Sequence, residues 1–270
     1  MIVRCLFLDL ISTLFIAKVM KKVIFGSLMF VFISTGFLQP KQKVSVAVAA
    51  NVQFAMEQLK SQFEKETGIE VDVTISSSGK FTAQIEEGAP YDLFVSADLS
   101  YPLELYKKSF TADAPRVYAN GSLVLWTMRN DLKPSIKELS SREIKKIAIA
   151  NPKIAPYGVA AEEALKYYKV YDEVKNKLVY GESIAQTNQY ITSTAADIGF
   201  TAKSVVLSSE MKGKGSWMDV DKKAYKPIAQ AAVILKHGKE KNANASQKFY
   251  NYLYSNNAKA ILKEYGYIVN

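Results

Sequence analysis

Short apolar runs rich in β-branched residues alternate with helical patterns of apolar residues from Lys43 onward. In the first part of this region, the runs predict strands at 44–48, 71–75 and 92–96. After the first strand, apolar residues recur at i, i+4, i+7 and i+11, which places them on one face of a helix that Gly68 ends. These residues are Val52, Met56, Leu59 and Phe63. Strands separated by amphipathic helices are typical of a parallel-sheet α/β protein.

The same alternation continues towards the C-terminus. Further short apolar runs predict four more strands, at 123–127, 147–150, 198–201 and 230–235. Helical periodicity predicts the remaining helices, at about 80–87, 160–171, 184–195, 245–254 and 257–265. Two of these helices have predicted inward faces, formed by Ala161, Ala164, Leu165 and Tyr168 in one and by Ile184, Ile191 and Ala195 in the other. The chain shows no internal repeat and no low-complexity tract.

The first 36 residues have the pattern of a leader. Met20-Lys21-Lys22 is a charged start, 23–33 is an apolar segment, and Ser34-Thr35-Gly36 offers a small-residue cleavage site. The apolar stretch 23–38 has 16 residues, whereas a membrane span needs about 20. We therefore expect a secretory signal peptide that is cleaved near Gly36, with an uncleaved anchor as the alternative.

Met20 begins a complete signal by itself, so we expect residues 1–19 to lie upstream of the true translation start. No cysteine follows the apolar segment, and a lipid-anchored form is therefore not expected. We expect the protein to be periplasmic.

Composition removes several classes of protein. The 270 residues are 49% hydrophobic and 23% charged, which excludes disorder as the main state. The single cysteine, Cys5, cannot form an intramolecular disulfide, and the single histidine, His237, cannot supply a clustered zinc site. We expect no cofactor.

The formal net charge is +9, but the basic residues are mostly lysine. Only four of the 35 basic residues are arginine, namely Arg4, Arg116, Arg129 and Arg142. Lysine lacks the planar fork that reads guanine edges or grips phosphate at two points. We therefore interpret the charge as a lysine-coated surface and expect no nucleic-acid partner.

Three places combine a strand end, a small or hydroxylic residue and a helix start: Ala49-Ala50-Asn51, Ser76-Ser77-Ser78-Gly79, and Ser183 before Ile184. Ligands of open α/β sheets bind beyond the carboxyl ends of the strands, and free N–H groups at helix starts bind anions. Several such starts that converge would hold an oxyanion. The alternative is that these residues are N-caps that serve stability only.

Seven motifs follow one another along the chain: Ala47-Val-Ala-Ala-Asn51, Ser76–Gly79, Gln84–Asp98, Gly121-Ser-Leu-Val124, Ala150-Asn-Pro152, Pro156-Tyr-Gly158 and Asp197-Ile-Gly199. In their order they resemble the molybdate-binding proteins of ABC importers. The resemblance extends from about Lys43 to Tyr267, and its most specific part is the block Gln84–Asp98.

This resemblance implies the type II periplasmic-binding-protein fold, in which two doubly wound α/β lobes are joined by two crossover strands with the ligand in the cleft between them. Lobe one would comprise 43–121 with 230–270, and lobe two 122–229. The crossovers would lie near Tyr118–Ser122 and Tyr225–Gln230.

The resemblance also implies the site. The side chains of Asn51 and Ser78 would bind the oxyanion together with backbone N–H groups of Ala50, Tyr157 and Ile184. Molybdenum would be held as its oxyanion through these residues, with no direct metal ligand.

Two positions depart from the family pattern. Many members have serine where this chain has Asn51, and many contribute a tyrosine hydroxyl just after the Asp197-Ile-Gly strand. At the second place this chain offers Phe200, Thr201 and Ala202, and the hydroxyl of Tyr157 is the available substitute.

The function that we expect is that of an exported, monomeric, non-enzymatic binding protein that captures molybdate, and also tungstate, and delivers it to the permease of an ABC importer. The same fold could take a different oxyanion or a small organic anion, and a tungstate-selective site could add the carboxylates of Asp98 and Glu182 to the metal shell.

Alternatives from other classes are a ligand-sensing domain of a regulator and a serine acyl-transferase. The second alternative rests on the S-x-x-K spacing of Ser77 and Lys80, but the chain lacks the companion Ser-Asp-Asn and Lys-Thr-Gly motifs.

Overall fold

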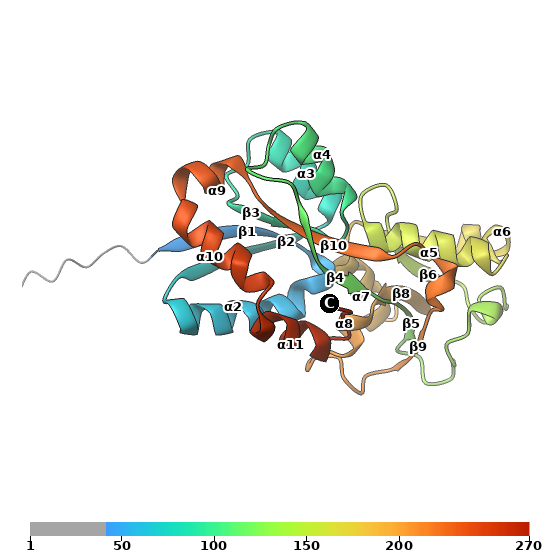
Figure 1. Ribbon diagram of the computed structural model, residues 1–270. Helices are drawn as coiled ribbons and strands as arrows, with labels where there is room; N and C mark the ends of the chain where they lie inside the picture. Colours follow the sequence, from blue (N-terminus) through green and yellow to red (C-terminus); the bar gives the residue numbers. More distant parts are fainter. Residues whose placement is uncertain (1–41, 270) are drawn as a thin grey trace, which may run out of the picture. The chain divides into compact units, whose positions relative to one another are not determined.

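Two five-stranded sheets organise the residues that the computed structural model describes, 42–269 (Figure 1). These residues belong to one compact unit, which begins at Lys41. The predicted leader, 1–36, and the predicted start at Met20 lie outside the described residues. Within 42–269, no helix has both the length and the apolar run that a membrane crossing requires.

The first sheet has the strand order β2-β1-β3-β10-β4. Its strands are β1 (Lys43–Ala49), β2 (Glu70–Ser76), β3 (Leu93–Val95), β4 (Arg116–Gly121) and β10 (Ile228–Ile234). β1 runs parallel to β2 and β3, whereas β10 is antiparallel to β3 and β4. The register pairs Ala49 with Ser76, so β1 and β2 end at the same level and bring the segments that follow them side by side.

Helices cover both faces of this sheet (Figure 1). On one face lie α2 (Gln53–Thr67), α10 (Ala243–Leu253) and α11 (Asn256–Glu264), and on the other lie α3 (Ser78–Glu86) and α4 (Ser100–Lys107). The short α9 (Lys236–Lys241) follows β10. The apolar face of α2 is buried as its periodicity predicts, and the ring of Phe63 meets that of Phe249 at 5.0 Å between centroids. Gly68 ends α2 in the left-handed conformation, with φ of 70°.

The second sheet has the order β7-β6-β8-β5-β9. Its strands are β5 (Leu123–Thr127), β6 (Ile147–Ala150), β7 (Leu178–Gly181), β8 (Ile198–Ala202) and β9 (Ser216–Asp219). β6 is parallel to β7 and β8, and β5 is antiparallel to β8 and β9. Its helices are α5 (Pro156–Tyr167), α6 (Tyr171–Val174), α7 (Ile184–Thr192) and α8 (Lys203–Val206). Short 3-10 turns lie at Ala50–Val52, Ile136–Glu138, Lys175–Lys177 and Lys222–Ala224.

Two crossovers join the sheets. β4 passes into β5 through Ser122 alone, and the chain returns after Tyr225 into β10. The first sheet with its helices forms the first lobe, and the second sheet with its helices forms the second lobe. The two-sheet α/β architecture with two crossovers confirms the predicted fold class, while the residue limits of the two lobes stay a prediction.

All seven predicted strands are present, but the predicted parallel sheets are wrong in detail because each sheet also contains antiparallel pairs. After the return crossover β10 runs antiparallel to its neighbours in the first sheet, and β5 runs antiparallel to its neighbours in the second. The sequence could not show this, because hydrophobic periodicity does not indicate the direction of a strand. α5 begins at Pro156 and ends at Tyr167, so Tyr168 is its C-cap and lies outside the helix. α7 ends at Thr192, and its predicted inward residue Ala195 is exposed while Ala196 is buried.

Candidate functional site

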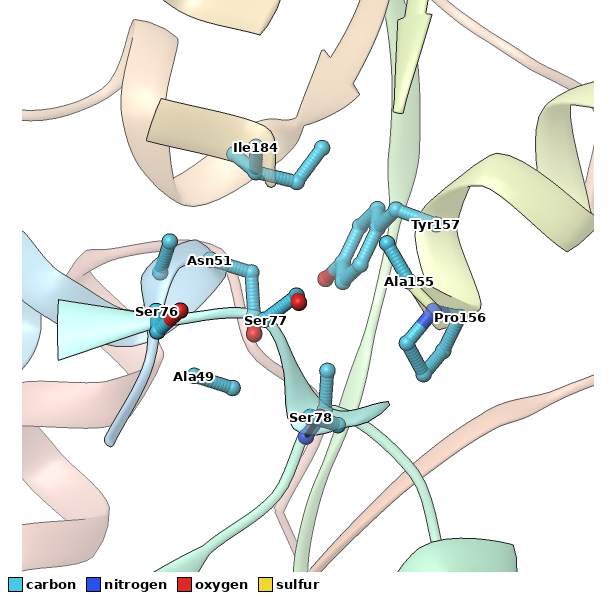
Figure 2. A pocket seen from close by; sticks show the side chains of 11 residues that line it. Ala49, Asn51, Ser76, Ser77, Ser78, Ala155, Pro156, Tyr157 and Ile184 are labelled. Atoms are coloured by element: carbon cyan, nitrogen blue, oxygen red, sulfur yellow. Dashed lines mark hydrogen bonds between the residues drawn. The ribbon is translucent and has the colours of Figure 1, made fainter. Parts of the chain in front are cut away.

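A small pocket lies where the carboxyl ends of β1 and β2 face the starts of α5 and α7 (Figure 2). Residues of both lobes line it: Ala49, Ala50, Asn51, Ser76, Ser77, Ser78, Ala97, Ala155, Pro156, Tyr157 and Ile184. All five residues that the sequence predicts for the site are among them. Segments more than 100 residues apart in the chain therefore converge on one space.

Three helices begin at this pocket. Ser78 is the first residue of α3, Pro156 and Tyr157 are the first two of α5, and Ile184 is the first of α7. Backbone N–H groups in a first helical turn have no preceding helical carbonyl to bind, and the helix dipole adds positive potential there. The arrangement thus favours an anion.

Local sequence explains why the helices begin here. Pro156 has a fixed φ that suits the first position of a helix, and its missing N–H costs nothing there. Ser183 caps α7 by accepting a hydrogen bond from the Gln186 N–H at 3.4 Å, which leaves the Ile184 N–H for the pocket. The N-caps of α3 and α5, Ser77 and Ala155, make no side-chain capping bond.

The hydroxyl of Ser78 is oriented by its neighbours. Its Oγ accepts from the Ala97 N–H at 3.0 Å and from the Ser96 hydroxyl at 3.1 Å, and Ser78 is 1% exposed. Because both neighbours donate to the oxygen, the Ser78 hydrogen is free to be donated to a ligand. Ser96 and Ala97 directly follow β3 and lie in the block Gln84–Asp98. This block therefore contributes to the site by holding the Ser78 hydroxyl in place.

Asn51 is held from several sides. Its backbone carbonyl accepts from the hydroxyls of Ser204 at 2.6 Å and Tyr267 at 2.8 Å. Its side-chain Nδ2 donates to Gln230 Oε1 at 2.9 Å, and its Oδ1 is buried with no hydrogen-bond partner among the described residues. A buried polar atom without a partner is costly, and it marks a place where a ligand can supply one.

The Tyr157 hydroxyl also faces the pocket (Figure 2). It accepts from Gln230 Nε2 at 3.1 Å, so its own hydrogen can be donated to a ligand. Burial raises the pKa of Tyr157 well above its ordinary value, which keeps the phenol neutral and a donor at physiological pH. By contrast, Thr201 donates to Asn188 Oδ1 at 2.5 Å and does not line the pocket.

The sequence analysis placed Ser77 in a candidate anion-binding segment but did not name its side chain among the site residues. Figure 2 shows its hydroxyl directed toward the same space as that of Tyr157, and it is buried without a hydrogen-bond partner in the described part of the chain. The acyl-transferase alternative needs Lys80 to contact Ser77, but the Lys80 ammonium contacts the carboxylate of Glu182 instead. This ion pair joins the first lobe to the second.

Neither Asp98 nor Glu182 lines the pocket. The Asp98 carboxylate accepts from the Ser100 hydroxyl at 2.5 Å and from the Tyr101 N–H at 3.4 Å, and burial raises its pKa. Across residues 42–269, no group of three or more His, Cys, Asp or Glu side chains is placed to hold a metal ion. The alternative in which these two carboxylates complete a metal shell therefore has no support in the geometry.

Size and charge limit the ligand further. The cavity volume of the pocket is about 10 Å³, whereas pockets for drug-sized molecules have about 300–1,000 Å³. Among the described residues that line it, none is charged. The pocket suits a small anion bound by neutral donors.

The lobes meet around the pocket. The Gly79 N–H donates to the Ile154 carbonyl at 2.9 Å, and the Tyr101 hydroxyl donates to the Lys153 carbonyl at 3.3 Å. With the Lys80 ion pair, these contacts hold the first lobe against the second beside the site.

Lys80→Ala is expected to weaken anion binding by less than about fivefold, because exposed ion pairs are worth little and the Lys80 and Glu182 side chains are 41% and 63% exposed. The loss should shrink further in high salt, where the pair is screened. Titration calorimetry at two salt concentrations checks both points, and Glu182→Gln is the matched control. A loss above thirtyfold would show that the lysine charge itself holds the anion.

Comparison with known proteins agrees with this geometry. The chain is 40% identical over 231 residues to the molybdate-binding protein ModA of Azotobacter vinelandii, covering 83% of this chain and 89% of that protein. It is 37% identical over 230 residues to the ModA of Rhodobacter capsulatus, covering 84% and 88%. The solved structure of the Azotobacter vinelandii periplasmic molybdate-binding protein superposes with a TM-score of 0.79 at 36% identity, covering 84% of this chain and 99% of that one.

The model of one family matches almost all of the described residues. It is named bacterial extracellular solute-binding protein, and it matches residues 44–268. Both lobes and both crossovers fall within the matched range. This chain therefore belongs to the family of bacterial extracellular solute-binding proteins.

Proposed function

We propose that this protein captures molybdate outside the cytoplasm and delivers it to the membrane permease of an ABC importer. The observation that carries the proposal is the uncharged pocket at which three helices begin, lined by Asn51, Ser78, Tyr157 and Ile184. Relatives at 40% and 37% identity are named for molybdate binding, which supports this ligand over other small anions.

The chemistry of the pocket favours a fully deprotonated dianion. The hydroxyls of Ser78 and Tyr157 and the N–H groups at three helix starts are donors, and a dianion can accept from all of them. Phosphate near neutral pH still carries a proton, which needs an acceptor. A buried polar group without a partner costs about 1–3 kcal/mol, so phosphate is disfavoured unless its proton is placed on the unpartnered Asn51 Oδ1.

Sulfate has the charge and the tetrahedral shape of molybdate but shorter bonds from the central atom to oxygen. The donors are fixed on strand ends and helix starts, so a smaller anion cannot reach all of them. Tungstate is nearly equal to molybdate in size and should bind as well. Selection against sulfate therefore depends on the size of the pocket.

Titration calorimetry with molybdate, tungstate, sulfate and phosphate tests this function. Molybdate and tungstate should bind with similar affinity, and sulfate and phosphate should bind more than tenfold more weakly. Sulfate binding within tenfold of molybdate would contradict the size argument, and absence of molybdate binding would overturn the proposed function.

We also propose that the working protein is a monomer that begins near Phe37, after removal of the leader in the periplasm. The mass of the intact protein purified from the periplasm should match a chain that starts there. A product that retains 23–33 would contradict cleavage and indicate an anchored protein.

A further inference from the structure

We propose that Gln230 is a positioning residue that decides which groups of the site donate to the ligand. Gln230 is fully buried and does not line the pocket. Its side-chain amide nevertheless contacts two residues that do, Asn51 of the first lobe and Tyr157 of the second. The inference rests on the proposed function, since it concerns how the same site selects its anion.

The contacts of Gln230 form one connected network. Oε1 accepts from Asn51 Nδ2 at 2.9 Å and from the Tyr118 hydroxyl at 2.7 Å, while Nε2 donates to the Tyr157 hydroxyl at 3.1 Å. Each end of the Gln230 amide therefore fixes one group that faces the ligand. Buried networks of this kind hold their members in one arrangement when every group is satisfied.

One group in the network is not satisfied. Asn51 Oδ1 is buried without a partner in the part of the chain that the structure describes, and it belongs to the amide that lines the pocket. With Nδ2 turned to Gln230, Asn51 offers the ligand an acceptor, which repels a deprotonated oxyanion and suits a protonated one. Reversal of the Asn51 amide would offer the ligand Nδ2 in place of this oxygen.

The Gln230 amide must turn together with that of Asn51. When both are reversed, Gln230 Nε2 donates to Asn51 Oδ1, and Gln230 Oε1 accepts from the Tyr157 hydroxyl. Asn51 Nδ2 is then free to donate to the ligand. The turn needs no backbone movement, but the Tyr118 hydroxyl, which donates to Gln230 Oε1, then faces Nε2 and must accept from it. In either arrangement only one of Asn51 and Tyr157 donates to the ligand, and Gln230 decides which.

The backbone around Gln230 is built to admit this network. The pairing of β10 with β4 shifts register between Gln230 and Ala231, and such bulges re-aim side chains beside functional sites. On β4, a Cβ added to Gly121 would lie 2.1 Å from the Tyr157 hydroxyl oxygen and 2.5 Å from Gln230 Nε2. Only glycine leaves room for the two side chains to meet at the crossover.

The test compares Gln230→Met with wild type. Methionine has a similar length and no charge, so it removes both amide contacts without adding electrostatic repulsion. Without the amide, Asn51 Nδ2 and the Tyr157 hydroxyl can donate to molybdate together, whereas the network leaves one of the two as an acceptor for the phosphate proton. Phosphate affinity is therefore expected to fall about tenfold more than molybdate affinity. The decisive readout is the ratio of the molybdate and phosphate dissociation constants, measured by titration calorimetry.

If Gln230 has only a structural role, both affinities fall by the same factor and the ratio of the dissociation constants does not change. That result would overturn the proposal, and so would two unchanged affinities. Tyr118→Phe is the second variant if Gln230→Met does not fold, because it removes only the contact to Gln230 Oε1. It should change the ratio in the same direction by a smaller factor, and an unchanged ratio in this folded variant would likewise overturn the proposal. If the wild-type protein does not bind molybdate, the proposed function is refuted. The test of Gln230 then uses the ratio of the dissociation constants of phosphate and of the dianion that the wild-type protein does bind.

Discussion

Gly79→Ala is expected to reduce molybdate affinity by at least about 100-fold while leaving the ligand-free protein as stable as wild type. A Cβ at this position would lie 2.9 Å from the Ile154 Cα of the second lobe and 2.9 Å from the Tyr101 hydroxyl oxygen. The Ile154 contact is with backbone, which cannot rotate away as a side chain can. The Ile154 contact exists only where the lobes meet, whereas Tyr101 belongs to the first lobe and its flexible side chain can rotate away. The substitution should therefore oppose the closed state.

The size of the effect depends on how ligands shift conformations. A ligand that contacts both lobes favours the closed state only by its difference in affinity for the two states. The alanine methyl group raises the free energy of the closed state, and binding loses that amount in full. The Gly79 N–H also donates to the Ile154 carbonyl at 2.9 Å, and a shifted backbone would lose this hydrogen bond as well.

Calorimetry measures the affinity, and small-angle scattering measures closure. Wild type should show a smaller radius of gyration with molybdate, and Gly79→Ala should not. Lys80→Ala, one residue further along α3, is the control, since it should keep the contraction. Binding within threefold of wild type, with normal contraction, would show that the second lobe yields at Ile154 and would contradict the prediction.

The sequence predicts those parts of the fold in which burial follows a simple period. The apolar face of α2 and the buried strands β1, β5 and β8 have patterns that depend on their own residues. β9 is mostly exposed and α9 is mostly polar, so neither carries an apolar pattern. Such elements form because a neighbouring element supplies hydrogen bonds or packing contacts. The residues that determine them therefore lie elsewhere in the chain.

The same distinction explains the site. The segments 49–51 and 76–79 could be predicted because each follows a strand at the start of a helical segment, and the resemblance singled out Asn51, Ser78 and Tyr157 within the predicted site. The partner of Asn51 is Gln230, 179 residues away, on a strand whose apolar pattern predicts burial but not the direction of one polar side chain. The sequence places Ser77 in the same segment as Ser78, but only the structure shows that its hydroxyl is buried without a partner among the described residues.

Ser78→Ala is expected to weaken molybdate binding about ten- to a hundredfold. A hydrogen bond to a charged group is worth about 1.5–3 kcal/mol, and the Ser78 hydroxyl is the donor whose orientation is fixed most completely by the protein. The Ala97 N–H and the Ser96 hydroxyl both donate to its oxygen, so the hydrogen is directed away from them. The substitution also removes the acceptor of the Ala97 N–H, and because both residues belong to the first lobe this loss lowers stability with or without ligand.

Ser96→Ala separates the two contributions to that loss. It removes the hydroxyl that supports Ser78 while keeping the Ala97 N–H and the Ser78 donor itself. If Ser78 donates to the anion, Ser96→Ala should weaken binding only a few-fold, and Ser78→Ala should weaken it far more. Thermal unfolding without ligand checks that both variants are folded. Equal losses would mean that the loop after β3, and not the Ser78 hydroxyl, determines binding. A Ser78→Ala variant that binds as tightly as wild type would show that the anion is held by the backbone N–H groups of the three helix starts alone.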